Sequence, residues 1–370
     1  MGFRDLVIQK RENDLVAASF GRGFYILDDY SPLRNFSNEI LKSKGHLFPI
    51  KDGKWFIQRS NLGNTGADYY IAENPKFGVT MTYHLSNNYE TKSDKRKKRE
   101  KRLNQKFLDV PFPGYTNLDE EKNEIPAYIK ISIEDENGNV IRHLKERASK
   151  GTHRITWDLR HMYKGSLSDL KNGSNLRGPI VKPGNYSASL YLIENGSTTK
   201  LGQERNFNLK PIYQSTLKGT SFEEYNKYMD DFFKVYNDTE STQHKLKTVG
   251  KKIKSLKIAI DNTPRKTDEL VLDFYNLKNS FLSLKIKALG NESKMEIGEK
   301  NPPSLINRIR VAGQGLSSSY GPTKLHLKSL DMARKINQEI NSLLDILISK
   351  EVNSLENKIK ISDGPVIIED

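Results

Sequence analysis

Asp28 and Asp29 are neighbouring carboxylates near the start of the chain, and their type and spacing could do chemistry. Paired carboxylates serve glycoside hydrolysis and cation binding. Glycoside hydrolysis also needs a second carboxylate across a cleft, and the sequence does not identify one. In the structural alternative, both residues cap a strand and hydrogen-bond to the turn YSPLR that follows them. We favour this alternative.

A second pattern is the run WDLR, which begins at Trp157. In a functional interpretation, a sugar ring stacks on Trp157 while Asp158 and Arg160 supply polar contacts. In the structural interpretation, Trp157 is a core residue at a strand end, and Asp158 and Arg160 form an ion pair or hold a loop. Ile155 and Trp157 share one face of the predicted strand, which favours the core role.

The third pattern is a basic run between Lys92 and Lys106, where nine basic and two acidic residues carry half of the formal net charge of +14. Such a run could bind nucleic acid or another polyanion, an acidic partner, or a membrane surface. Alternatively, it is a solvated helix in which Asp94 and Glu100 make local ion pairs. Aromatic residues do not interleave with the charges, so nucleic acid is not the favoured partner. The candidate polyanion-binding residues are Lys95, Arg96, Lys97, Lys98, Arg99, Lys101 and Arg102.

Several chemistries have no motif in this sequence. The absence of cysteine removes disulfides, thiol catalysis and thiolate metal sites. The seven histidines lack the spacing of a zinc motif, and the glycine-containing stretch VAGQGLSSSYGP lacks the GK[ST] of a phosphate-binding loop. We therefore predict neither a metal nor a cofactor. We also expect no transmembrane span, and the N-terminal residues lack the pattern of a signal peptide.

The elements that position these residues change in character along the 370-residue chain, which is long enough for two or three domains. Short strands separated by turn residues occupy residues 1–45. Alternating strands and hairpin signals over residues 46–212 predict an Ig-like antiparallel β-sandwich, interrupted by the basic insertion at 86–126, which we expect to lie between two adjacent strands. Alternation places Ile129, Ile131 and Ile133 on one face, and it directs Tyr186, Ala188, Leu190 and Leu192 inward before a turn at Asn195 and Gly196. Apolar stripes at helical spacing predict an antiparallel α-helical bundle over 213–362, followed by a tail at 363–370. One stripe consists of Leu246, Val249, Ile253, Leu256 and Ile260, and Phe222, Tyr225, Phe232 and Tyr236 continue it toward the N-terminus. The last helix is predicted from about Thr323 to Ile359. The predicted class is multidomain α+β.

The stretch DLVAASFGRGFYILDDYSPLR resembles the segment that closes the propeller in bacterial sortilin-type β-propeller proteins, often labelled BNR-repeat glycosyl-hydrolase-like. The segments HLFPIKD, NPKFGVTMTYHL, GNVIRHL, GTHRITWDLR and GPIVKPGNYSASLYL resemble later marks of that family in the same order. A helical region follows in the family. The resemblance implies that residues 1–45 are the remnant of a terminal propeller blade with its linker. It also implies an extracellular or periplasmic protein.

In functional terms, the resemblance implies a non-catalytic accessory region that braces the propeller and binds polysaccharide or protein. The upstream blades would be its partners. The family's SxDxGxTW repeats do not occur in this chain, so the label of glycosidase activity does not transfer to it. An alternative is a glycoside hydrolase-like enzyme whose active site lies mainly in the propeller, with Arg22, Asp28 and Asp29 lining the cleft. Polyanion binding through the basic insertion is a second alternative, and whether the protein is an enzyme stays open.

Overall fold

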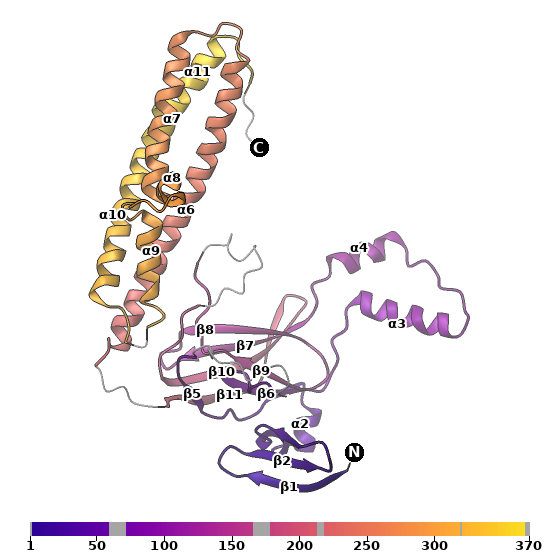
Figure 1. Ribbon diagram of the computed structural model, residues 1–370. Coiled ribbons are helices and arrows are strands. Elements are labelled where there is room, and N and C mark those ends of the chain that lie inside the picture. The colour runs from indigo at the N-terminus through magenta and orange to yellow at the C-terminus, as the bar shows by residue number, and fades with distance from the viewer. Residues whose placement is uncertain (1, 59–71, 166–177, 213–217, 319, 367–370) are drawn as a thin grey trace. The chain divides into compact units, whose positions relative to one another are not determined.

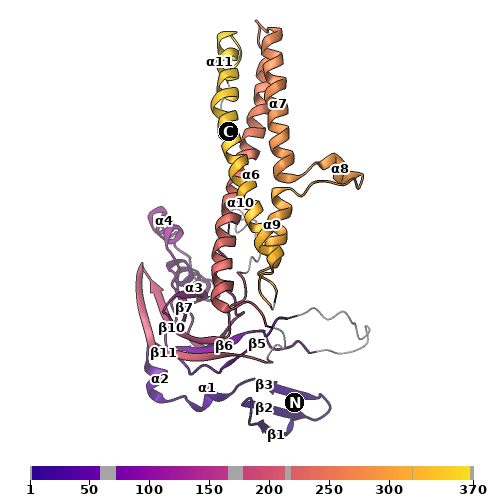
Figure 2. The ribbon, with the colours of Figure 1, turned by 90° about the vertical axis from the view of Figure 1, so that its left-hand side faces the viewer.

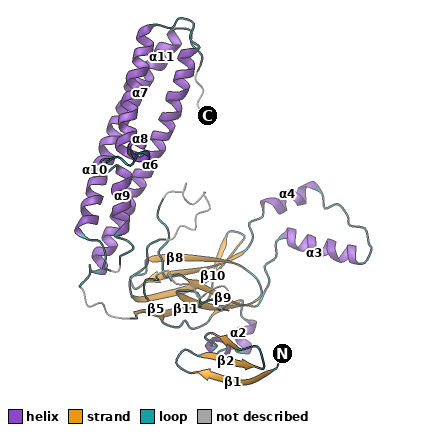
Figure 3. Cartoon of the chain, viewed as in Figure 1, coloured by secondary structure: helices purple, strands orange, loops and turns teal. Residues whose placement is uncertain are grey.

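The computed structural model describes residues 2–58, 72–165, 178–212, 218–318 and 320–366 (Figure 1). The chain divides into two compact units. The first contains residues 1–162 and 180–214, and the second contains residues 163–179 and 215–370. Strands dominate the first unit and helices the second (Figure 3). The fold is therefore mixed, with mainly antiparallel sheets and a C-terminal helical region.

The chain begins with a three-stranded antiparallel sheet, in agreement with the predicted short strands. Gly21 and Gly23 both have a φ of 73° in the β2–β3 turn, a conformation that glycine adopts at little cost. Two short helices follow the sheet. The bounds are β1 (Phe3–Gln9), β2 (Asp14–Ser19), β3 (Phe24–Leu27), α1 (Ser31–Arg34) and α2 (Asn38–Lys42).

A five-stranded sheet, curled like part of a barrel, has the order β5-β11-β10-β7-β8 (Figure 2). Its strands are β5 (Gly53–Trp55), β7 (Tyr128–Asp135), β8 (Val140–Arg147), β10 (Gly184–Glu194) and β11 (Ser197–Pro211). The pairs are antiparallel except that β5 runs parallel to β11. The predicted hairpin turn at Asn195 and Gly196 is confirmed, since both residues have positive φ.

A three-stranded sheet, in the order β4-β6-β9, shares an apolar core with the five-stranded sheet. Its strands are β4 (Gly45–Leu47), β6 (Val79–Leu85) and β9 (Gly151–Trp157). The alternation predicted for β7 and β10 is confirmed, because all of the residues assigned to the inner face are buried. They are Ile129, Ile131, Ile133, Tyr186, Ala188, Leu190 and Leu192.

Gly78, just before β6, lies against the backbone of β9. Its φ is +126°, and a Cβ atom built there would lie 1.8 Å from the carbonyl oxygen of Trp157. Since no other residue combines this φ with the absence of a Cβ, glycine is required for β6 and β9 to approach each other.

The basic insertion lies between β6 and β7, which belong to different sheets, so it does not join neighbouring strands as we expected. It contains α3 (Lys92–Gln105) and α4 (Tyr115–Asn123), and neither helix has a buried residue. We did not predict α4, which contains Asp119, Glu120 and Glu121. The two helices form a hairpin that is separate from the apolar core.

Three long helical segments pack together in the second unit. They are α6 (Phe222–Asp261), then α7 (Asp268–Leu289) with α9 (Leu305–Gln314), and finally α10 (Lys324–Ile346), η1 (Leu347–Val352) and α11 (Asn353–Ile361). The short helix α8 (Glu292–Glu296) projects away from them (Figure 2). Ser221 and Glu224 form a capping box at the start of α6, which satisfies its first backbone donors.

The predicted apolar stripe of α6 is buried at Leu246, Val249, Ile253, Leu256 and Ile260. It packs with α7, α9, α10 and α11 in one apolar cluster. The prediction was wrong for Phe222, which is exposed because it is the first residue of the helix. None of the helices in the described part of the chain is both long and apolar enough to cross a bilayer.

The segment η1 is a π-helical turn inside the final helix, which we predicted as a continuous helix from Thr323 to Ile359. Leu347 and Val352 are both buried, although they are five positions apart in the sequence. In an α-helix this spacing would rotate one of them out of the core. The wider turn keeps both on the same side.

Candidate functional site

The N-terminal sheet exposes apolar side chains to solvent on both outer strands. Ala17 on β2 is buried, whereas Phe24 on β3 is 76% exposed. Successive residues of a strand point to opposite faces, so the apolar residues of β1 and β3 cover both faces of this sheet. The exposed set, which we call the apolar sheet surface, is Phe3, Leu6, Val7, Ile8, Phe24, Tyr25, Ile26 and Leu27.

Two polar anchors hold this sheet to the rest of the first unit. Glu12, between β1 and β2, pairs with Lys51 and with Lys54, the latter at 3.0 Å. Hydrogen bonds from these lysines lower the pKa of Glu12 to about 2. Arg154 on β9 donates to the carbonyl oxygens that follow β3, those of Asp28 at 2.6 Å and Asp29 at 2.5 Å.

At Asp29 the structure agrees with the structural alternative, in which the carboxylate hydrogen-bonds to the turn that follows it. Its Oδ1 accepts from the backbone N–H of Ser31 at 3.2 Å and from the Ser31 hydroxyl at 2.6 Å. The backbone N–H of Asp29 donates to Asp14 Oδ1 at 2.9 Å, and its φ is +40°. The carboxylate therefore stabilises the turn after β3. Asp28 and Arg22 are exposed.

Trp157 is fully buried, which corrects its place among the candidate ligand-binding residues. Its indole N–H donates to the carbonyl oxygen of Arg160 at 2.9 Å, and its ring packs edge-on against Tyr186 and Phe207. No ring face remains open for a sugar. Arg160 forms an isolated antiparallel β-bridge with Ile180, outside the named strands. Asp158, between Trp157 and Arg160 on the chain, is half-buried.

Metal-binding chemistry finds no support in the part of the chain that the structure describes. No cluster of three or more histidine, aspartate or glutamate side chains is arranged there to hold an ion. His84 Nδ1 lies 3.2 Å from the Thr152 hydroxyl, and His153 Nε2 lies 2.8 Å from the carbonyl oxygen of Ser149. These contacts give both rings structural partners within the protein.

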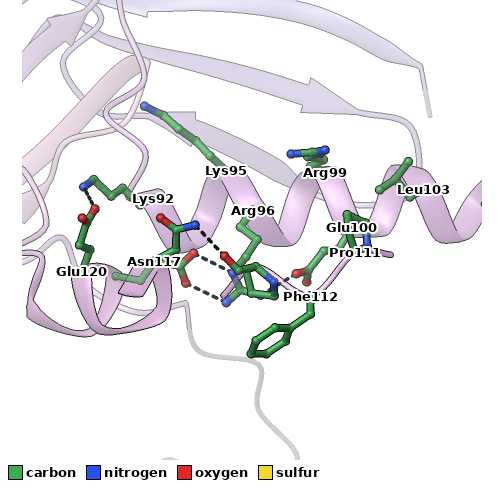
Figure 4. A pocket seen from close by; sticks show the side chains of 12 residues that line it. Lys92, Lys95, Arg96, Arg99, Glu100, Leu103, Pro111, Phe112, Asn117 and Glu120 are labelled. Carbon is green, nitrogen blue, oxygen red and sulfur yellow. Dashed lines mark hydrogen bonds and ion pairs between the residues drawn. The ribbon is translucent and has the colours of Figure 1, made fainter. Parts of the chain in front are cut away.

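The hairpin of α3 and α4 brings the basic run against acidic residues (Figure 4). Arg96 holds Glu121 with two hydrogen bonds, of 2.7 and 2.8 Å, and Glu100 with a third of 2.7 Å. Lys92 pairs with Glu120 at 2.7 Å. These hydrogen bonds raise the pKa of Arg96 and lower that of Glu121. Arg96 therefore stabilises the hairpin instead of presenting its charge to a ligand.

The other ion pairs of α3 test the local pairs that we predicted for Asp94 and Glu100. Glu100 pairs within its own helix, as predicted. Asp94 instead pairs with Arg147 on β8, at 2.9 Å, so the local pair expected for it was wrong. Lys98 pairs with Glu90, which precedes the helix.

The remaining cations of α3 and its C-cap are exposed and have no ion pair within the described residues. Four of them recur at i, i+4, i+7 and i+11, which places them along one side of the helix. This cationic stripe consists of Lys95, Arg99, Arg102 and Lys106. Lys97 and Lys101 lie on the opposite side. In Figure 4, the side chains of Lys95 and Arg99 leave α3 away from Glu100 and Glu120.

Two shallow grooves border α3. One, of about 470 Å³, lies between α3, α4 and the loop that joins them, and Figure 4 shows its lining. The other, of about 420 Å³, is lined by the whole cationic stripe together with Glu90, Lys98, Leu103 and Leu108. Sequence reasoning identified the cations but missed that α4 neutralises some of them. The acidic run at 119–124 was the available signal.

No family model matches the chain, and no curated protein matches it. Among solved structures, the chain is similar to dimeric latent PorU from Porphyromonas gingivalis, with 10% identity and a TM-score of 0.22, covering 54% of this chain and 12% of that one. It is also similar to CopC from Methylosinus trichosporium OB3b, with 11% identity and a TM-score of 0.18, covering 39% of this chain and 85% of that one. The chain thus spans a small part of PorU. At these TM-scores, neither likeness informs fold or function.

Proposed function

We propose that this chain is a non-catalytic accessory region of a secreted sortilin-like β-propeller protein. In this proposal, the three N-terminal strands join the terminal blade. The two sheets that share a core act as an Ig-like sandwich, and the C-terminal helices act as an antiparallel bundle. Together they brace the propeller, and they offer surfaces for a polysaccharide or a protein.

The observation that carries the proposal is the apolar sheet surface. A propeller blade has four antiparallel strands, and the sheet of β1, β2 and β3 has three. Within the described residues, β1 and β3 are both edge strands, since each pairs with β2 alone in this sheet. Exposed edges of this kind invite pairing with another strand. A blade that supplies the next strand would satisfy one edge.

Burial of the apolar sheet surface against a partner would also be energetically favourable. Burying a large apolar side chain contributes about 1.5–3 kcal/mol. Phe24 and Ile26 are mostly exposed, as is Leu6 on the other edge strand. Covering these three alone would contribute several kcal/mol by that estimate. The sheet of β1, β2 and β3 buries few of its own apolar side chains. A β-rich partner that covers them would therefore stabilise it.

The enzyme alternative draws less support from the geometry. Asp29 hydrogen-bonds within its own turn, and Asp28 is exposed. A glycosidase site would need a second carboxylate at a defined separation.

Hydrogen exchange tests the proposal. We expect residues 3–27 of the isolated chain to exchange much faster than α6. The same peptides should be protected in the native species, isolated from its host with an antibody against the helical region. The double change Phe24→Ser and Ile26→Ser should leave the chain folded but weaken its association with the propeller. Equally fast exchange at residues 3–27 in the native species would contradict the proposal.

A further inference from the structure

We propose that the α3–α4 hairpin binds the surface of an anionic lipid bilayer. The cationic stripe would contact headgroup phosphates, and Phe107 with Leu108 would enter the interfacial layer. This inference does not depend on the proposed role of the N-terminal sheet, because the two surfaces share no residue.

The electrostatic part rests on charges left unpaired after the hairpin has formed. Acidic residues of the insertion hold Lys92, Arg96 and Lys98. The stripe keeps its four charges, exposed and along one side of α3. Each Lys or Arg brought close to an anionic bilayer strengthens binding about fivefold. Because the stripe lies on one side of α3, all four cations can contact the same flat bilayer surface.

The apolar part rests on the end of α3, where the chain exposes Phe107. Leu108 N–H donates to the carbonyl oxygen of Leu103 at 3.0 Å, and Phe107 N–H donates to that of Asn104 at 3.1 Å. This is the pattern of a Schellman cap, in which the residue at the Phe107 position is usually glycine. Phe107 adopts a φ of +56° there, and its side chain is 98% exposed. The fold thus holds an aromatic ring in solvent at a position that disfavours it.

Charge and apolar surface meet in one groove. The groove of about 420 Å³ that contains the stripe is also lined by Leu103 and Leu108, and Leu108 is 54% exposed. Basic residues on a helix with adjacent Phe and Leu are typical of segments that lie in the membrane interface. The arrangement gives both kinds of contact to a bilayer at once.

Nucleic acid fits these observations less well. Leu108 and Val110 are exposed aliphatic residues, which offer no stacking surface to a base. The aromatics Phe107, Phe112 and Tyr115 follow the charged helix instead of interleaving with it. A bilayer uses aliphatic and aromatic side chains alike.

Vesicle sedimentation of the full chain tests the electrostatic part. The vesicles contain phosphatidylcholine alone or with about 30% phosphatidylserine, at low salt. We expect binding to the anionic vesicles only. Arg99→Gln with Arg102→Gln should weaken it about 25-fold. Lys97→Gln with Lys101→Gln removes the same charge from the opposite side and should weaken it less than about threefold. Equal losses, or no binding to anionic vesicles, would overturn the proposal.

Phe107→Gly tests the apolar part without risk to the fold, since glycine suits the φ of this position. We expect about a tenfold loss of vesicle binding that persists at high salt. Ile125→Ser, an exposed apolar residue at the far end of the hairpin, is the matched control and should leave binding unchanged. Labelled single-stranded DNA is the competing probe. Tighter binding to DNA than to vesicles, unaffected by Phe107→Gly, would refute the bilayer as the partner.

Discussion

Replacing Gly78 with alanine should be among the most damaging single-methyl changes in the first unit. The added Cβ would lie 1.8 Å from the carbonyl oxygen of Trp157, far inside contact distance, and the obstacle is backbone that cannot rotate away. Overpacking of this kind costs about 1–3 kcal/mol. Holding alanine at a φ of +126° adds about 1–3 kcal/mol. We expect the free energy of unfolding of this unit to fall by about 4 kcal/mol.

The two tryptophans give a convenient assay. Trp55 is on β5 and Trp157 on β9, so tryptophan fluorescence, excited selectively over tyrosine, reports on the first unit alone. A helix signal in circular dichroism follows the second unit, which keeps the two transitions apart. With a urea slope of about 1–3 kcal/mol per molar, the fluorescence midpoint should fall by about 2 M. The helix transition should not move.

Gly138→Ala is the matched control, because Gly138 has a φ of +77° and no atom within 4 Å of the added Cβ. Gly138→Ala incurs the cost of a positive φ without a steric clash. We expect the free energy of unfolding to fall by about 1 kcal/mol. Equal urea midpoints for the two variants would refute this explanation, because the close approach of β6 and β9 would then not be what requires glycine at position 78.

Three further outcomes follow from polar contacts. Glu12→Gln should destabilise the N-terminal sheet by about 0.5–1 kcal/mol at neutral pH. The effect is small because the two lysine partners are exposed to solvent, which weakens the ion pairs. Because the folded pKa is lowered to about 2 from 4.5, the difference from wild type should be complete above pH 4.5 and vanish as the pH falls to about 2, as measured by hydrogen exchange at residues 3–27. Tyr228→Phe removes a buried hydrogen bond of 2.8 Å to the carbonyl oxygen of Ala312 and should lower the thermal stability of the helical unit by about 1–2 kcal/mol; an unchanged melting temperature would contradict it. Asn337→Leu should stabilise that unit by about 1 kcal/mol, because Asn337 Oδ1 is buried without a hydrogen-bond partner among the described residues; a lower melting temperature would show that the amide has a role we have not identified.

The parts of the fold that follow a local period could be predicted from the sequence. Ile129, Ile131 and Ile133 alternate with polar residues, and all three are buried. The stripe from Leu246 to Ile260 repeats at helical spacing, and it faces the core. In both cases, each residue's position depends on its near neighbours, so the pattern is visible without the rest of the chain.

Other features depend on contacts between distant segments. The parallel pairing of β5 with β11 joins residues about 150 positions apart, which no local pattern reveals. The helix α4 has little apolar periodicity, and Arg96 holds it through Glu121. The sequence therefore identified the cations of the basic run but not which of them are neutralised. That distinction separates the cationic stripe from the residues that merely hold the hairpin.

The π-helical turn at Leu347–Val352 bears on how related chains should be compared. Removing one residue from this turn would convert it to an ordinary α-helical turn, and Leu355 and Ile359 would still reach the core. Homologues one residue shorter here would thus have the same helix. Aligning them without a one-residue gap at this point would pair core residues with solvent residues over all of α11. The turn is a place where the chain can change length while the helix keeps its phase.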